Sequence, residues 1–162
     1  MVKDNSTKLI RSGLKRTEFM ETSEPLFLTS GFVYNSAEEA EDAFKERKKR
    51  FMYSRFGNPT VHMLQDKLAD IEGAEVCWCT STGMAAVFTI FMSFLKKGDR
   101  VVAGRALFGS CHHIITKILP RFGIEVELID GKDLNAWEKA LKKKTSLIFF
   151  ETPSNPCLEI ID

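Results

Sequence analysis

Short apolar runs alternate with helical segments through the second half of the chain, and this alternation restricts the fold more than any other feature. The connections between these segments are short. We expect strands at Glu75–Thr80, Arg100–Gly104, Ile124–Ile129 and Ser146–Phe150, and helices at Thr82–Leu95, Ser110–Leu119 and Leu134–Leu141. Strands and helices in this order form a parallel sheet with right-handed crossovers. The sequence therefore predicts an α/β fold with a mostly parallel sheet and helices on both faces.

The first half of the chain lacks this alternation. Residues 1–35 are polar and show few periodic apolar positions, so we expect an extended arm rather than a compact element. Ser36 should cap a charged helix that runs to Arg50, with acidic residues first and basic residues last. A second helix should begin after Asn58 and end at Gly73. Its predicted apolar stripe consists of Val61, Leu64, Leu68 and Ile71.

Length and composition exclude several classes of protein. With 162 residues, 44% of them apolar, the chain can form a packed core. We divide it into an N-terminal arm with the first helix, residues 1–50, and the start of a larger domain, residues 51–162. A formal net charge of +1 gives no general attraction to nucleic acid or to a membrane surface. No apolar run reaches the ~18 residues of a membrane span, and no secretory signal is evident, so we expect a cytoplasmic location.

The cysteines do not have the spacing of a metal or redox site. The C-W-C pair is one residue shorter than the usual motif, and the three histidines add no ligand pattern. We therefore predict reduced, packed thiols and no metal site. The cysteines are Cys77, Cys79, Cys111 and Cys157.

Two motifs carry groups suited to binding a phosphate. In C-T-S-T-G-M-A-A, Cys79–Ala86, a strand passes through a turn of small residues into a helix, whose first N–H groups favour an anion. Gly83 lets a ligand approach the backbone there. In Y-S-R-x-x-N-P-T, Tyr53 and Arg55 combine a phenol with a guanidinium, which suits a phosphate dianion. Each motif also has a plain structural interpretation. The first is then only a capped helix start, and the second only a surface loop.

A third motif, E-T-P-S-N-P, follows the last predicted strand. Its two prolines restrict the loop and present Asn155, although an ordinary turn has a similar composition. Ligands of open α/β sheets bind at the carboxyl ends of the strands. The chain ends at Asp162, soon after this loop, so we expect the residues that complete the site to lie beyond it.

Together the three motifs resemble the Cys/Met-metabolism family of pyridoxal-phosphate enzymes. This family includes cystathionine synthases and lyases, methionine lyases and acyl-homoserine sulfhydrylases. The resemblance runs from about Thr7 to the last residue. The segment L-I-R-S-G-L-K-R-T-E-F-M-E-T-S-E-P-L-F-L-T-S-G-F is most similar to the O-succinylhomoserine sulfhydrylase branch. The resemblance implies pyridoxal 5′-phosphate as the cofactor, and the large domain of a fold-type I enzyme, incomplete at its carboxyl end.

The resemblance also implies how the cofactor phosphate is held. Gly83 and Met84 would donate backbone N–H groups to the phosphate within their own subunit. Tyr53 and Arg55 would hold the phosphate of the neighbouring subunit. We therefore expect a homo-oligomer, a dimer or a tetramer, whose sites are shared between subunits.

Three further residues would contact or support the rest of the cofactor. Asn155 would touch the phenolic oxygen of the cofactor or the substrate carboxylate, and Glu151 would support the cofactor face through hydrogen bonds. Most of the family has a tyrosine that stacks on the pyridine ring. In the matching segment L-F-G-S-C, Phe108 takes this place. Its ring keeps the stacking face but lacks a phenol for proton transfer, which fits a sulfhydrylase better than a lyase.

The resemblance implies a lysine that forms a Schiff base with the cofactor and an aspartate that pairs with its pyridinium nitrogen. We expect both beyond Asp162, so no catalytic residue is assigned within the chain, and we expect negligible turnover by the chain alone. The favoured function is replacement of the γ-substituent of an O-acylhomoserine by a sulfur nucleophile. The alternatives are a cystathionine or methionine lyase and a non-catalytic fragment of a split or decayed gene.

Overall fold

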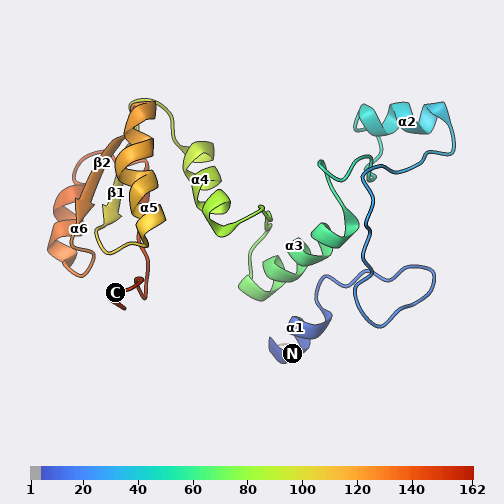
Figure 1. Cartoon of the computed structure of the whole chain (residues 1–162), viewed down its shortest axis with the longest axis horizontal. Helices are drawn as coiled ribbons and strands as arrows, with labels where there is room; N and C mark the ends of the chain where they lie inside the picture. Colours follow the sequence, from blue (N-terminus) through green and yellow to red (C-terminus); the bar gives the residue numbers. More distant parts are fainter. Residues whose placement is uncertain (1–4) are drawn as a thin grey trace. The chain divides into compact units, whose positions relative to one another are not determined.

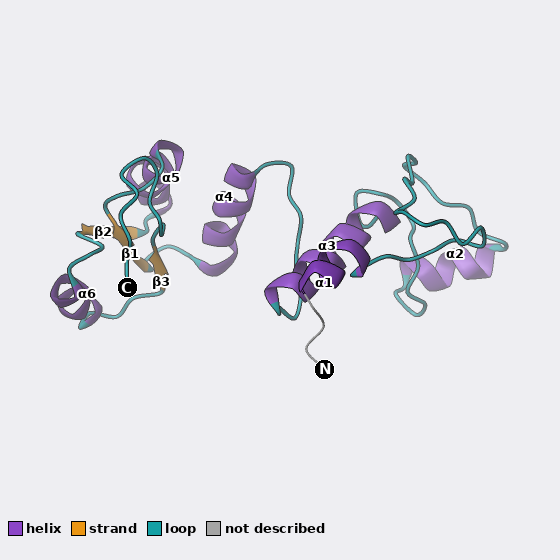
Figure 2. Ribbon diagram, turned by 90° about the horizontal axis from the view of Figure 1, so that it is seen from below, coloured by secondary structure: helices purple, strands orange, loops and turns teal. Residues whose placement is uncertain are grey.

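The computed structural model describes residues 5–162. The chain divides into two compact units, Met1–Cys79 and Thr80–Asp162, and each is described by itself (Figures 1 and 2). The division into residues 1–50 and 51–162 remains a prediction about domains. Within residues 5–162, no helix has the length and apolar character needed to cross a membrane.

The second unit contains a three-stranded parallel sheet with strand order β2-β1-β3. The strands are β1 (Arg100–Gly104), β2 (Glu125–Ile129) and β3 (Leu147–Phe149). The helices are α4 (Gly83–Phe94), α5 (Gly109–His113) and α6 (Leu134–Leu141), with a π-helical turn (Ile114–Ile118) and a 3-10 turn (Leu119–Phe122) after α5. Each of these elements lies at or within a few residues of its predicted position.

Helices cover both faces of the sheet. Alternate residues of β1 point to opposite sides of the sheet and therefore pack against different helices. Val101 belongs to a buried cluster with Phe91 of α4 and Ile115, which follows α5. Val102 belongs to a second cluster with Ala140 of α6. This arrangement confirms the predicted α/β fold with a parallel sheet between two layers of helices.

The strand predicted at Glu75–Thr80 is absent, and this prediction was wrong. The segment pairs with no described strand, and Val76 and Trp78 are 67% and 75% exposed. An apolar run becomes a strand only where a neighbour accepts and donates its backbone hydrogen bonds. The last strand forms as predicted but is shorter, and in the described sheet it lies at an edge, with Ile148 44% exposed.

The described part of the first unit, residues 5–79, contains three helices, and its arm is more ordered than predicted. They are α1 (Asn5–Arg11), α2 (Ala37–Phe44) and α3 (Pro59–Glu72). Helix α1 lies within the predicted extended arm and packs against α3. Lys8 pairs with Asp70 at 3.3 Å, and the chain then passes so close to α3 that a Cβ at Gly13 would lie 2.3 Å from the Met63 carbonyl oxygen. Tertiary contacts therefore stabilise a helix that is too short to be stable alone.

Helix α3 begins and ends as predicted but buries a different face. Asn58 caps its start and Gly73 ends it in the left-handed conformation, with φ +65°. Of the predicted apolar stripe, Val61, Leu64 and Leu68 are exposed, whereas Met63 is buried. The face bearing Met63 is the one that the Gly13 turn approaches, so the neighbouring segment, rather than the periodicity, decided which face is covered.

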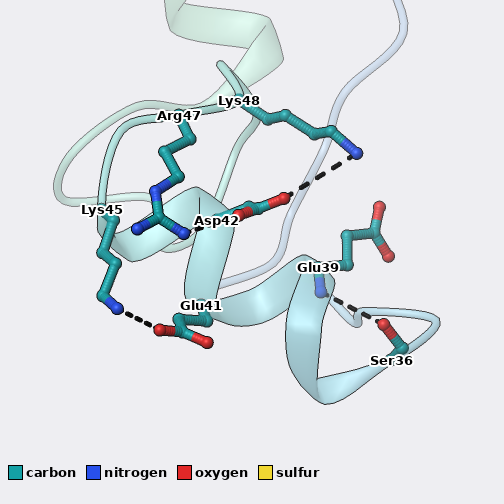
Figure 3. Close-up of polar contacts among 7 residues, drawn as sticks. All are labelled: Ser36, Glu39, Glu41, Asp42, Lys45, Arg47 and Lys48. Atoms are coloured by element: carbon teal, nitrogen blue, oxygen red, sulfur yellow. Dashed lines mark hydrogen bonds and ion pairs between the residues drawn. The ribbon is translucent and has the colours of Figure 1, made fainter.

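Helix α2 begins as predicted but ends at Phe44 rather than Arg50. The Ser36 hydroxyl accepts the Glu39 N–H at 3.1 Å (Figure 3). Glu46 has φ +56°, which stops the helix. The basic residues that follow turn back, and Arg47 and Lys48 both pair with Asp42, at 3.4 and 3.9 Å.

Candidate functional site

The carboxyl edge of the sheet collects most of the residues singled out in the sequence. Residues 95–99 connect α4 directly to β1, so the two run in opposite directions and α4 begins at the carboxyl end of β1. Figure 1 shows the starts of α4 and α5 at the end to which the β1 and β2 arrowheads point. Phe108, Glu151 and Asn155 lie in loops that follow β1 and β3. This edge is where open α/β sheets bind ligands.

The start of α4 presents free backbone donors. The Thr82 hydroxyl accepts the Ala85 N–H at 3.0 Å, and the Thr82 carbonyl accepts that of Ala86. Among the described residues, nothing accepts the N–H groups of Gly83 and Met84. A Cβ at Gly83 would meet no atom within 4 Å, so packing in this chain does not require glycine there. The arrangement leaves both the donors and the space that an anion needs.

Glu151 joins the two loops at this edge. Its carboxylate accepts the Phe108 N–H at 2.9 and 3.0 Å and the Asn155 N–H at 3.4 Å. The thiol of Cys111, buried in the first turn of α5, also interacts with Glu151. Burial raises the pKa of this thiol, and the hydrogen bond and negative charge of Glu151 raise it further. Glu151 therefore holds both residues expected to face the cofactor.

The side chains of these two residues are open to a ligand. The Phe108 ring is 43% exposed. Asn155 is exposed, and in the part of the chain that the structure describes its carboxamide has no hydrogen-bond partner. An accessible aromatic face suits a planar ring, and a free carboxamide can donate to an oxygen.

The sequence interpretation missed two residues that shape this edge, Ser154 and Ile161. Ser154 is 1% exposed and exchanges hydrogen bonds with Glu159 at 3.0 and 3.1 Å. A Cβ added at Gly131 would lie 2.5 Å from the Cδ1 atom of Ile161, so the Ile161 side chain occupies the space beside Gly131. Ile161 therefore covers the ends of β1 and β2. A serine between two prolines was visible in the sequence, but its burial was not.

Tyr53 and Arg55 lie in the first unit, in the loop before α3. The Arg55 guanidinium carbon is 5.2 Å from the centre of the Tyr53 ring and 5.3 Å from that of Phe56. No carboxylate of residues 5–162 pairs with Arg55. A charged group that is supported by rings but not neutralised can accept an external anion.

The cysteine predictions have a mixed outcome. All four are free thiols, but only Cys111 is buried; Cys77 and Cys79 are partly exposed and Cys157 is exposed. Within the described chain, no group of three histidine, cysteine or acidic residues is arranged to bind a metal.

Comparison with known proteins identifies a family of enzymes that this chain matches. The sequence profile described as Cys/Met metabolism PLP-dependent enzyme matches residues 6–162. An O-succinylhomoserine sulfhydrylase of Mycobacterium tuberculosis is 48% identical over 94% of this chain and 38% of its own length. An L-methionine gamma-lyase of Fusobacterium nucleatum is 36% identical over 96% of this chain and 40% of its own length.

A solved structure shares the fold. It is described as an O-acetylhomoserine (thiol)-lyase from Campylobacter jejuni with N′-pyridoxyl-lysine-5′-monophosphate. Its TM-score is 0.88 at 29% identity, and the alignment covers 98% of this chain and 39% of the Campylobacter jejuni chain. The chain thus spans about two fifths of the length of the relatives it matches.

Proposed function

The chain belongs to the Cys/Met metabolism PLP-dependent enzyme family, and on this premise we propose that it supplies part of the cofactor site of an O-acylhomoserine sulfhydrylase. Such an enzyme replaces the γ-substituent of the amino-acid substrate with a sulfur nucleophile. The observation that carries the proposal is the 48% identity to an O-succinylhomoserine sulfhydrylase over nearly the whole chain. Phe108, whose ring would stack on the cofactor without offering a phenol, is consistent with it.

The carboxyl edge of the sheet fits the cofactor. The Gly83 and Met84 N–H groups would receive the phosphate, because they have no acceptor among the described residues and the space beside Gly83 is open. The exposed ring of Phe108 would stack on the pyridine ring, and Asn155 would donate to an oxygen of the cofactor or of the substrate. When bound, pyridoxal phosphate withdraws electrons from the substrate carbon that bears the amino group.

Tyr53 and Arg55 would bind the phosphate of a neighbouring subunit. The support for this role is the exposed Arg55 guanidinium, which no carboxylate of residues 5–162 pairs with and which lies beside the exposed phenol of Tyr53. A homo-oligomer with shared sites follows from it. Sedimentation tests this association, and a stable monomer that binds the cofactor fully would contradict it.

A chimera tests the proposed reaction. The matching segment of the M. tuberculosis relative is replaced by this chain, and the product is assayed with O-succinylhomoserine plus sulfide, and separately with methionine and with cystathionine. We expect activity in the first assay to exceed activity in the other two. The unmodified relative is the control. A chimera that folds and binds cofactor but acts only on methionine or cystathionine would overturn the proposal.

A lyase is the second candidate, because a methionine gamma-lyase is 36% identical over 96% of the chain. The chimera separates these two enzymes by its substrate preference. A non-catalytic fragment is the third candidate. It predicts that the chimera binds cofactor without turnover in any of the three assays.

The isolated chain should not form a specific covalent adduct with the cofactor. Only Lys132, among described lysines, lies in a loop that follows a strand at the carboxyl edge. It pairs with Glu159 at 3.1 Å, and this hydrogen bond raises the pKa of Lys132, so the amine stays protonated and is a poor nucleophile. Treatment with pyridoxal phosphate and borohydride, followed by mass spectrometry, checks this, with Lys132→Met as the control. A stoichiometric adduct at one lysine would contradict the expectation.

A further inference from the structure

We propose that Asn58 is a positioning residue, whose carboxamide holds the Tyr53–Arg55 loop in its anion-binding conformation by tying it to the N-terminal arm. The functional part of this inference rests on the proposed role of Tyr53 and Arg55. The structural part, that Asn58 orders the loop, stands on contacts within the first unit.

Every polar atom of the Asn58 side chain has a partner. The side chain is almost fully buried, with 7% of the residue exposed. Its Oδ1 accepts the Thr60 N–H at 2.9 Å, which caps α3. Its Nδ2 donates to the Phe27 carbonyl oxygen and to the Ser54 hydroxyl, both at 2.9 Å. One carboxamide therefore joins the helix start, the arm and the loop.

Asn58 lies within a longer seam of hydrogen bonds between the arm and the loop. The Ser54 N–H donates to the Ser30 carbonyl at 2.8 Å, and the Ser54 hydroxyl donates to that of Thr29. On the other side of Asn58, the Phe27 N–H donates to the Thr60 hydroxyl at 2.9 Å. Ser54 is therefore turned toward Asn58 and the arm. The residues on either side of it, Tyr53 and Arg55, are exposed.

No ion pair within residues 5–162 fixes the Arg55 guanidinium, so the backbone of the loop sets where its charge lies. Only the two neighbouring rings contact its guanidinium among the interactions of residues 5–162. An anion site needs its donors to converge before the ligand arrives, since ordering them during binding costs affinity. Asn58 supplies that order, because its carboxamide bonds to the arm, to the loop and to the start of α3.

The substitution Asn58→Asp tests this proposal, because aspartate can cap a helix as well as asparagine does. Asn58→Asp keeps the acceptor for Thr60 but replaces both Nδ2 bonds with a carboxylate that faces the Phe27 carbonyl. The helix should therefore keep its cap, whereas the loop loses the Asn58 hydrogen bonds that tie it to the arm. Ser54→Ala removes one partner of Asn58 and its own bond to the arm, and serves as a second, milder variant.

The first measurement is amide hydrogen exchange in the 162-residue chain. We expect Asn58→Asp to accelerate exchange of the Ser54 N–H by about tenfold, the factor for one lost hydrogen bond, with less effect in the middle of α3. Ser54→Ala should accelerate exchange of the Phe32 N–H, which donates to Met52 in the same seam. Unchanged exchange in the loop of both variants would overturn the proposal, as would equal acceleration throughout the first unit.

The second measurement is binding of inorganic phosphate, followed by the backbone amide NMR signals of residues 53–56 at matched ionic strength, which are present in every variant. We expect Asn58→Asp to weaken binding by about tenfold or more, and Arg55→Gln to abolish it. If Arg55→Gln binds phosphate like the unmodified chain, the proposed function of the loop is wrong. The exchange data still test whether Asn58 orders the loop. If the loop loosens but phosphate affinity is unchanged, the positioning role is overturned.

Discussion

Both carboxylate oxygens of Glu151 accept the backbone N–H of Phe108, at 2.9 and 3.0 Å. This contact joins the end of β3 to the start of α5 across 43 residues of sequence. Cys111, in the first turn of α5, interacts with the same carboxylate. The position of the Phe108 ring therefore depends on a charge in another loop.

Replacing Glu151 should be detectable through the Cys111 thiol. Glu151→Gln keeps the shape of the side chain but removes the charge that helps to raise the pKa of Cys111. The thiolate fraction at pH 8 should rise by about tenfold for each unit by which the pKa falls. The rate of labelling by a disulfide reagent measures this change. Cys157, which is exposed, is the internal control, and equal changes in both rates would contradict the prediction.

Asp99 should make the second unit more stable at neutral pH than in acid. Its carboxylate accepts the Lys96 N–H at 2.8 Å and the Ser146 hydroxyl at 2.9 Å, and these bonds lower its pKa below the ordinary value of 3.8. The stabilisation is present above the unfolded pKa and is lost as the pH falls through the lower folded pKa. Urea unfolding from pH 7 to pH 3 measures it. Asp99→Asn should show a smaller loss in acid, and parallel curves would contradict this assignment.

Gly13 should tolerate substitution less well than Gly73. Both have positive φ, +71° and +65°, so alanine strains either backbone by about 1–2 kcal/mol. At Gly13 the new Cβ would also meet the Met63 carbonyl oxygen at 2.3 Å, whereas at Gly73 it meets nothing within 4 Å. We expect Gly13→Ala to lower the free energy of unfolding by at least ~1 kcal/mol more than Gly73→Ala. Equal losses in urea unfolding would contradict the packing of the arm on α3.

Phe108→Tyr tests the stacking role proposed for Phe108. In the chimera the substituted ring should still stack, because stacking needs only the ring face. The added phenol should raise elimination relative to sulfur transfer, and the ratio of ketoacid to sulfur-containing product measures this. Phe108→Leu is the control for the loss of the ring. A ratio unchanged by tyrosine would show that the phenol at this position does not distinguish the two reactions.

Local sequence was sufficient wherever the physical cause was local. Asn58 and Pro59 start α3 and Gly73 ends it, because capping and left-handed backbone depend on the residue itself. Strand β1 was predicted to the residue, since its apolar run lies between clear turn signals. Glu75–Thr80 has an equally apolar pattern but is not a strand, because a strand also needs a neighbour.

The sequence by itself determined the α/β class, the family and the residues that bear the candidate chemistry. Their motifs are contiguous, and the chemistry of a side chain does not depend on the fold. Only the tertiary structure decided which of them meet. Glu151 reaches Phe108, and Asn58 reaches Phe27 from 31 residues away. Hydrogen bonds act over about 3 Å, so such partners are set by the path of the chain, which no single motif encodes.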